Sequence, residues 1–182
     1  MNTAWAWGAL GISLMLGCGG SGTSADPDGS TGTPMSCGAV ASMEVGRCVV
    51  DSGGDCQGAL GEVYSLTSLS DGDAMRMVVG PQGSTMLVFL VRTDGIDPGD
   101  SASTYPLVQV SLFDTAARRQ LTEYRQRVSF VADGAGFRSE QLWVVVDALA
   151  SDLSGRNVTA TARLTDRNGV ARCAIVDVSP QR

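Results

Sequence analysis

The side chains of this sequence that could do acid–base chemistry are carboxylates and almost nothing else. The chain has 182 residues with no His, and its 13 basic residues are all Arg because it contains no Lys. Without imidazole there is no Ser-His-Asp triad, no Cys-His pair and no histidine metal ligand. Without Lys there is no Schiff-base nucleophile, and Arg cannot act as a base because it stays protonated. We therefore expect neither an enzyme nor a cofactor.

The carboxylates leave one catalytic alternative open. The sequence contains 19 Asp and Glu residues, and two carboxylates held about 5–9 Å apart can hydrolyse a glycoside. No spacing in the sequence singles out such a pair. A carboxylate-dependent glycan hydrolase is therefore the least favoured of the functions considered below.

Three carboxylates, Asp94, Asp97 and Asp100, lie close together in the segment RTDGIDPGDS. Ca²⁺ takes roughly six to eight oxygen ligands, so this cluster is the one candidate metal site. Its spacing does not match the D-x-[DN]-x-[DN]-G calcium loop. Asp, Gly and Pro are also the residues that form turns, and we expect a turn here and no metal.

Arginines gather in a later segment, RRQLTEYRQR. On a regular strand, Arg119, Arg125 and Arg127 share one face with Glu123. Guanidinium groups bind carboxylates and phosphates in a bidentate manner, so this face could meet an anionic glycan or an acidic protein. The alternative is a solvated face that discourages edge-to-edge aggregation. The net charge of −6 gives no basic footprint for nucleic acid.

The first residues predict a secretory signal. Residues 4–16 (AWAWGALGISLML) are apolar or small, and as a helix they would extend only ~20 Å, less than the roughly 30 Å bilayer core. That length is typical of the apolar region of a signal peptide. An uncleaved membrane anchor and an ordinary cleaved signal are the alternatives.

The residues that follow, Met15-Leu16-Gly17-Cys18, resemble the lipobox that ends the signal peptides of bacterial lipoproteins. The resemblance implies cleavage before Cys18 and attachment of lipid to that cysteine. Gly19 stands where Asp would signal retention in the inner membrane, so the resemblance implies a cell-envelope protein anchored in the outer membrane.

The cysteine count agrees with lipidation of Cys18. The chain has five cysteines, and an odd number in an exported protein needs an explanation. If Cys18 carries lipid, Cys37, Cys48, Cys56 and Cys173 remain for two disulfides. Three pairings are possible, and each joins one of the first three cysteines to Cys173. No C-x-x-C pair supports a metal site instead.

Composition divides the chain into three parts. Residues 1–17 are the expected signal peptide. Residues 18–34 comprise the lipidated cysteine and a linker of Gly, Ser, Thr, Asp, Pro and Ala that cannot seed a core and is expected to be disordered. Its 16 residues after Cys18 span roughly 20–24 Å as a flexible chain. Residues 35–182 are the expected folded domain.

The folded domain is predicted to be all-β. Short apolar or alternating runs separated by Gly, Asp, Asn and Pro predict about eight or nine strands, at 47–51, 62–69, 74–79, 85–92, 107–113, 121–131, 142–148, 158–164 and 170–178. The run 85–92 is apolar on both faces and predicts a central strand. Turns after residues 79 and 165 predict two hairpins, the second around Asn168-Gly169.

Regularly spaced strands without intervening helices favour an antiparallel two-sheet sandwich over a parallel α/β sheet. The stretch LSGRNVTATARLTDRNGVARCAIVDV resembles the last strands of an immunoglobulin-like or fibronectin-like domain. A jelly roll or a small barrel is the structural alternative.

These expectations lead to a non-catalytic binding or structural module held at a membrane by its lipid, with a protein or glycan partner. A second hypothesis is an envelope-assembly or inhibitor protein that binds its partner by strand addition at an exposed sheet edge.

Overall fold

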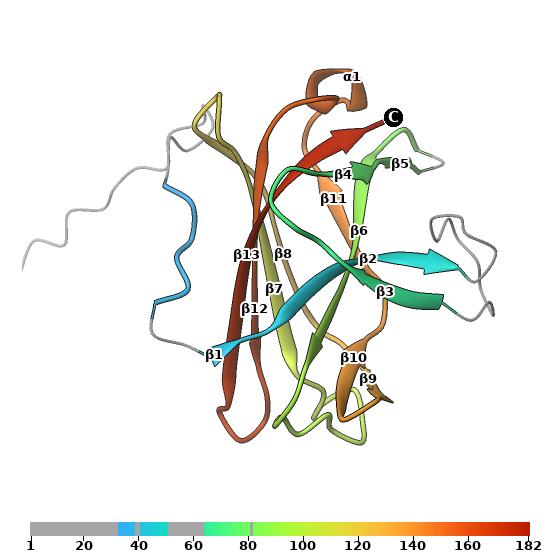
Figure 1. The fold of residues 1–182 in the computed structure, drawn as a ribbon, viewed down its shortest axis with the longest axis vertical. Helices are drawn as coiled ribbons and strands as arrows, with labels where there is room; N and C mark the ends of the chain where they lie inside the picture. Colours follow the sequence, from blue (N-terminus) through green and yellow to red (C-terminus); the bar gives the residue numbers. More distant parts are fainter. Residues whose placement is uncertain (1–32, 39–40, 51–63, 81) are drawn as a thin grey trace, which may run out of the picture.

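The computed structural model describes residues 33–38, 41–50, 64–80 and 82–182. Over these residues two β-sheets pack face to face (Figure 1), which confirms the predicted all-β sandwich. The described part of the chain contains one short helix, α1 (Ala150–Leu153). The strands are β1 (Ala41–Ser42), β2 (Glu44–Val50), β3 (Tyr64–Ser68), β4 (Asp73–Arg76), β5 (Val78–Val79), β6 (Thr85–Thr93), β7 (Leu107–Asp114), β8 (Arg119–Arg127), β9 (Phe130–Asp133), β10 (Gly136–Ser139), β11 (Leu142–Val146), β12 (Val158–Thr165) and β13 (Ala171–Gln181).

The first sheet, sheet A, has six strands in the order β1-β13-β12-β7-β8, with β4 also paired to β13. The pairs among β13, β12, β7 and β8 are antiparallel, whereas β1 and β4 run parallel to β13. The long strand β13 holds β1 near its start and β4 near its end. Strand β8 is therefore an outermost strand of this sheet.

The second sheet, sheet B, has seven strands in the order β3-β2-β6-β10-β9, with β5 and β11 also paired to β6. Strand β6 thus lies at the centre, as its two apolar faces predicted. The chain crosses from sheet A to sheet B between β1 and β2, so its N-terminal part contributes to both layers. The hairpin β2–β3 extends away from the sandwich on the right of Figure 1.

The core fills the space between the sheets. Alternate residues of facing strands point inward and lose nearly all contact with solvent, which is the main stabilisation of a sandwich. The inward residues of the central strands are Leu87, Phe89, Val91, Val108, Val110, Leu112, Leu142, Val144, Val158, Ala160, Ala162 and Leu164.

Two predicted strands are each divided, because the partner strand ends. The segment 74–79 pairs with β13 only as far as Gln181, whose carbonyl accepts a hydrogen bond from Met77 N–H at 2.7 Å. The chain then crosses to sheet B, where β5 pairs with β6, so β5 alone forms the predicted hairpin. The segment 121–131 divides likewise, since β7 begins at Leu107 opposite Arg127. The hairpin at Asn168-Gly169 is confirmed.

Candidate functional site

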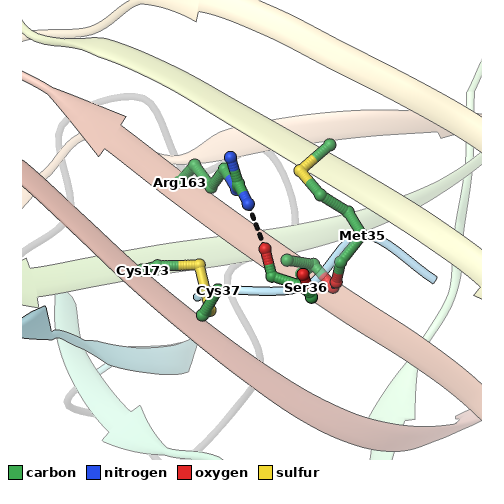
Figure 2. Close-up of a disulfide and its surroundings, with 6 residues drawn as sticks. Met35, Ser36, Cys37, Arg163 and Cys173 are labelled. Atoms are coloured by element: carbon green, nitrogen blue, oxygen red, sulfur yellow. Dashed lines mark hydrogen bonds between the residues drawn. A yellow bond between two sulfur atoms is a disulfide. The ribbon is translucent and has the colours of Figure 1, made fainter. Parts of the chain in front are cut away.

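A short segment before β1 lies on the outer face of sheet A, fixed to β12 and β13. The Thr161 hydroxyl donates a hydrogen bond to the Met35 carbonyl at 3.1 Å, and the Arg163 guanidinium donates one to the Ser36 carbonyl. One residue further on, Cys37 forms a disulfide with Cys173. Figure 2 shows Arg163 and the disulfide holding the segment from two neighbouring strands.

This disulfide is the expected long-range cross-link. It joins residues 136 apart in the sequence, with a Cα–Cα distance of 5.5 Å. Met43 N–H also donates to the Cys173 carbonyl at 3.3 Å, so the segment and β1 are attached at the same part of β13. The N-terminal side of the chain therefore meets the domain at one covalently fixed place.

Cys48 is also disulfide-bonded. Its side chain is buried beside Leu90, with Tyr64 and Leu66 packed against the two. Cys18 and Cys56 lie outside the described residues. With Cys37 and Cys173 joined, pairing of Cys48 with Cys56 stays the prediction of the two-disulfide scheme.

The arginine segment forms the outermost strand β8, and a β-bulge changes which residues share a face. Thr122 lies opposite Leu112, but Gln120 lies opposite Phe113, so Leu121 is the extra residue. Leu121 turns into the core and is only 4% exposed. The extra residue reverses the alternation of side chains beyond the bulge. Arg119 therefore lies opposite Asp114, on the face of the sheet opposite to that of Arg125 and Arg127.

Arg119 is thus separated from Arg125 and Arg127, which regular alternation would have grouped with it. Arg125 and Arg127 remain on the outer face of sheet A with Glu123, opposite Gln109, Leu107 and Ser111.

The same three residues of β8 direct their backbone groups away from β7. Val128 N–H donates to the Pro106 carbonyl at 3.0 Å, so the hydrogen-bonded positions of β8 are the even-numbered ones, because bonding alternates along an antiparallel pair. The N–H and C=O groups of Glu123, Arg125 and Arg127 therefore point to the open edge. Among the described residues, the one backbone bond on this side is from Asp147 N–H to Leu121 O, at 3.4 Å.

The side chains along this edge differ in how they are engaged. Gln109 donates to the Glu123 carboxylate at 2.6 Å, and Arg127 donates to the Tyr105 carbonyl at 2.7 Å. Arg125 has no hydrogen-bond or ion-pair partner within the described part of the chain. On the opposite face of β8, burial and the Glu140 carboxylate raise the pKa of Tyr124, which stays a neutral donor to Gln126.

The acidic loop between β6 and β7 is bonded to the turn between β12 and β13. Asp97 accepts hydrogen bonds from Gly99 N–H at 2.9 Å and from Arg167 at 2.6 Å. These bonds, that of Gly99 foremost, hold the pKa of Asp97 below its ordinary value. Asp97 N–H in turn donates to Asp166 in the β12–β13 turn at 2.8 Å.

The other two acids of the calcium candidate lie apart from this contact. Asp100 accepts a hydrogen bond from Thr104, and Asp94 is exposed. No group of three or more Cys, Asp or Glu side chains in the described ranges is placed to hold a metal ion.

Two carboxylates line one shallow hollow of about 430 Å³, formed where β1, β2 and β6 meet the β9–β10 turn. These are Glu44 and Asp94, and Arg92 of β6, which lies opposite Glu44 of β2, lines the same hollow. The Glu44 carboxylate is engaged by the Ser68 hydroxyl and lies 3.9 Å from Arg92. The hydrolase alternative, for which the sequence singles out no carboxylate pair, stays a prediction.

No protein-family model matches the chain, and neither does any curated protein. In the part of the chain that the structure describes, no helix has the length and apolar composition needed to cross a bilayer.

Sequence reasoning missed the residues that hold the N-terminal segment. Thr161 and Arg163 read as ordinary outward residues of an alternating strand, yet Thr161 is only 1% exposed. The available signal was indirect. A disulfide from Cys37 to Cys173 brings residues 35 and 36 close to β13, and Arg163 lies directly opposite Cys173 on the neighbouring strand.

Proposed function

We propose that this chain is an envelope lipoprotein whose folded domain is a tethered binding module. In this account the chain is cleaved before Cys18, which carries lipid anchored in the outer membrane, and residues 19–34 form the tether. The supporting observation is the fixation of residues 35–37 to sheet A. A load on the tether would pass through the Cys37–Cys173 disulfide to β13, the longest strand of the sandwich.

We also infer that the sandwich is of the immunoglobulin type. The order β8-β7-β12-β13 in sheet A corresponds to strands C′, C, F and G of a variable-type domain. The early strands β1 and β4 run parallel to the last strand, and β2, β6 and β11 follow one another in the second sheet. This topology supports the immunoglobulin-like resemblance over a jelly roll.

For the mode of binding, the open edge of β8 favours strand addition to a protein partner. Within residues 122–127, the backbone groups of Glu123, Arg125 and Arg127 have no partners in the described structure. The absence of His and Lys supports a non-catalytic role.

The anchoring part of this proposal is tested by cell fractionation of the Cys18→Ser variant. Release of the variant from membranes, with the parent chain retained, is the expected result. Because the apolar residues 4–16 could hold an unprocessed chain in the membrane, the N-terminus of any variant protein retained there is sequenced as well. Continued membrane association of a variant processed like the parent would contradict lipid anchoring.

A further inference from the structure

We infer that the open edge of β8 accepts an extended acidic segment of another protein as an added strand. The inference rests on the proposed binding function and names the chemistry of the partner. It is carried by three features of the same short stretch: backbone groups and a guanidinium that have no partner among the described residues, and a bulge that ends the site.

The backbone features define where the added strand pairs. Glu123, Arg125 and Arg127 offer their N–H and C=O groups to the open side, as the Val128–Pro106 bond implies. Beyond them the bulge at Leu121 interrupts the regular edge, and the Leu121 carbonyl is occupied by Asp147 N–H. The available edge is therefore the stretch 122–127, enough for a short strand.

The side chains define what the added strand carries. Its outward residues would lie beside Arg125 and Arg127, where carboxylates gain cross-strand attraction. The Glu123 carboxylate is already engaged by Gln109, so it opposes such a partner less than a free carboxylate would. Arg125, which has no partner among the described residues, supplies the main contact.

The same charges disfavour a second copy of this chain at this edge. Two β8 strands paired around a two-fold axis at Arg125 would place the two Arg125 guanidinium groups directly opposite each other, which is destabilising, and would leave Arg127 of each copy opposite Glu123 of the other, a carboxylate that Gln109 already engages. The chain's own residues 35–37 lie over β12 and β13, on the far side of β7 from this edge, so they leave the edge of β8 uncovered.

The test uses the full chain purified in detergent and an eight-residue peptide of alternating Thr and Glu. Binding is measured by calorimetric titration, and amide exchange shows where the peptide lies. We expect binding with new protection at residues 123, 125 and 127. Two peptides serve as controls, one with Lys in place of Glu and one with N-methylated Glu, which keeps the charge but cannot pair as a strand. Neither is expected to bind.

Three variants separate charge from backbone. Arg125→Glu is expected to weaken binding about tenfold, because attraction becomes repulsion. Its matched control is Arg119→Glu, the same change on the same strand but on the other face, which is expected to leave binding within about twofold. Arg125→Pro removes an outward N–H without removing a bond to β7, so the fold is retained while binding is lost.

In the titrations, the inference would be overturned if the Thr-Glu peptide did not bind or if the N-methylated peptide bound equally well. It would also be overturned if Arg125→Glu and Arg119→Glu weakened binding equally. In the exchange experiment, protection of β3 in place of β8 would overturn it. Circular dichroism and thermal unfolding confirm that each variant is folded. These outcomes are independent of the anchor. A chain whose Cys18→Ser variant stays on membranes can still bind the peptide, and an anchored chain can fail to bind it.

Discussion

At the scale of single residues, Asp114 is the buried charge on which the β7–β8 turn depends. Its side chain is fully buried, and it accepts hydrogen bonds from Arg156 at 2.8 Å and from Ala117 N–H at 2.9 Å. Burial acts to raise the pKa of Asp114, but the Ala117 and Arg156 bonds outweigh it, and the pKa lies below its ordinary value of 3.8.

We predict that Asp114→Ala lowers the free energy of unfolding by about 2–4 kcal/mol, because Arg156 and the turn lose their buried acceptor. Urea denaturation at neutral pH measures this loss. Asp147→Ala, at an exposed acidic residue, is the control and is expected to change stability by less than about 0.5 kcal/mol. Equal effects of the two substitutions would contradict the role given to Asp114.

The pH dependence of this contribution follows from the direction of the shift. Since Asp114 is more acidic in the folded chain than in the unfolded chain, its contribution is complete above the unfolded pKa of about 3.9. It is lost as the pH falls through the folded pKa. The stability difference between the parent chain and Asp114→Asn is therefore expected to shrink below about pH 4. A stability difference between the two proteins that stays constant down to pH 2 would contradict the lowered pKa of Asp114.

At the scale of elements, strand β8 shows where regular alternation of side chains stops predicting which face of the sheet a residue occupies. The pattern of RRQLTEYRQR places Leu121 among charged residues, which is a conflict for a strand with one buried side. The fold resolves it with a bulge that turns Leu121 into the core and moves Arg119 off the face of Arg125. An apolar residue in a polar row was the available signal, but the place of the bulge depends on β7, which local sequence does not specify.

We predict an alternating exchange pattern along β8 in the free protein. The amides of Thr122, Tyr124 and Gln126 bond to β7 and are expected to exchange slowly, whereas those of Arg125 and Arg127 face the open edge and are expected to exchange fast. Hydrogen exchange followed by NMR resolves the individual amides. Uniform protection would show that this edge is covered in the full-length protein.

Strand pairing across the sandwich was beyond prediction for a related reason. The strand at 85–92 and the Asn168-Gly169 hairpin follow from local patterns and are confirmed. The division of 74–79 between two sheets follows from the end of β13, a residue range far away in the sequence. Short crossings of this kind leave no local signal, because both halves look like one strand.

At the scale of the whole molecule, the Cys37–Cys173 disulfide closes almost the entire domain into one loop. We predict that replacing both cysteines by Ser lowers the free energy of unfolding by about 4–5 kcal/mol, because the unfolded chain gains freedom. Urea denaturation of the double variant measures this. Arg163→Ala, which breaks one hydrogen bond to the same segment, is expected to cost about 1 kcal/mol. A double variant no less stable than Arg163→Ala would contradict the role given to the cross-link.

The start of the folded domain is a prediction from composition alone, because residues 1–32 lie outside the described structure. Composition predicts that folded sequence starts at residue 35, and, among the described residues, residues 35–37 are bound to sheet A. Cysteine parity supplied the reason to separate Cys18 from the other four. Both arguments use only composition and residue counts, so they need no knowledge of the fold. An open strand edge, by contrast, can be identified only once the fold is known.

The most direct test of the account is the intact mass of the protein isolated from the membranes of its own cells. We predict the mass of residues 18–182 with acyl groups on Cys18, and no thiol that reacts with an alkylating reagent before reduction. A chain that still begins at Met1, begins beyond Cys18 or carries an unmodified Cys18 would contradict the proposed lipoprotein.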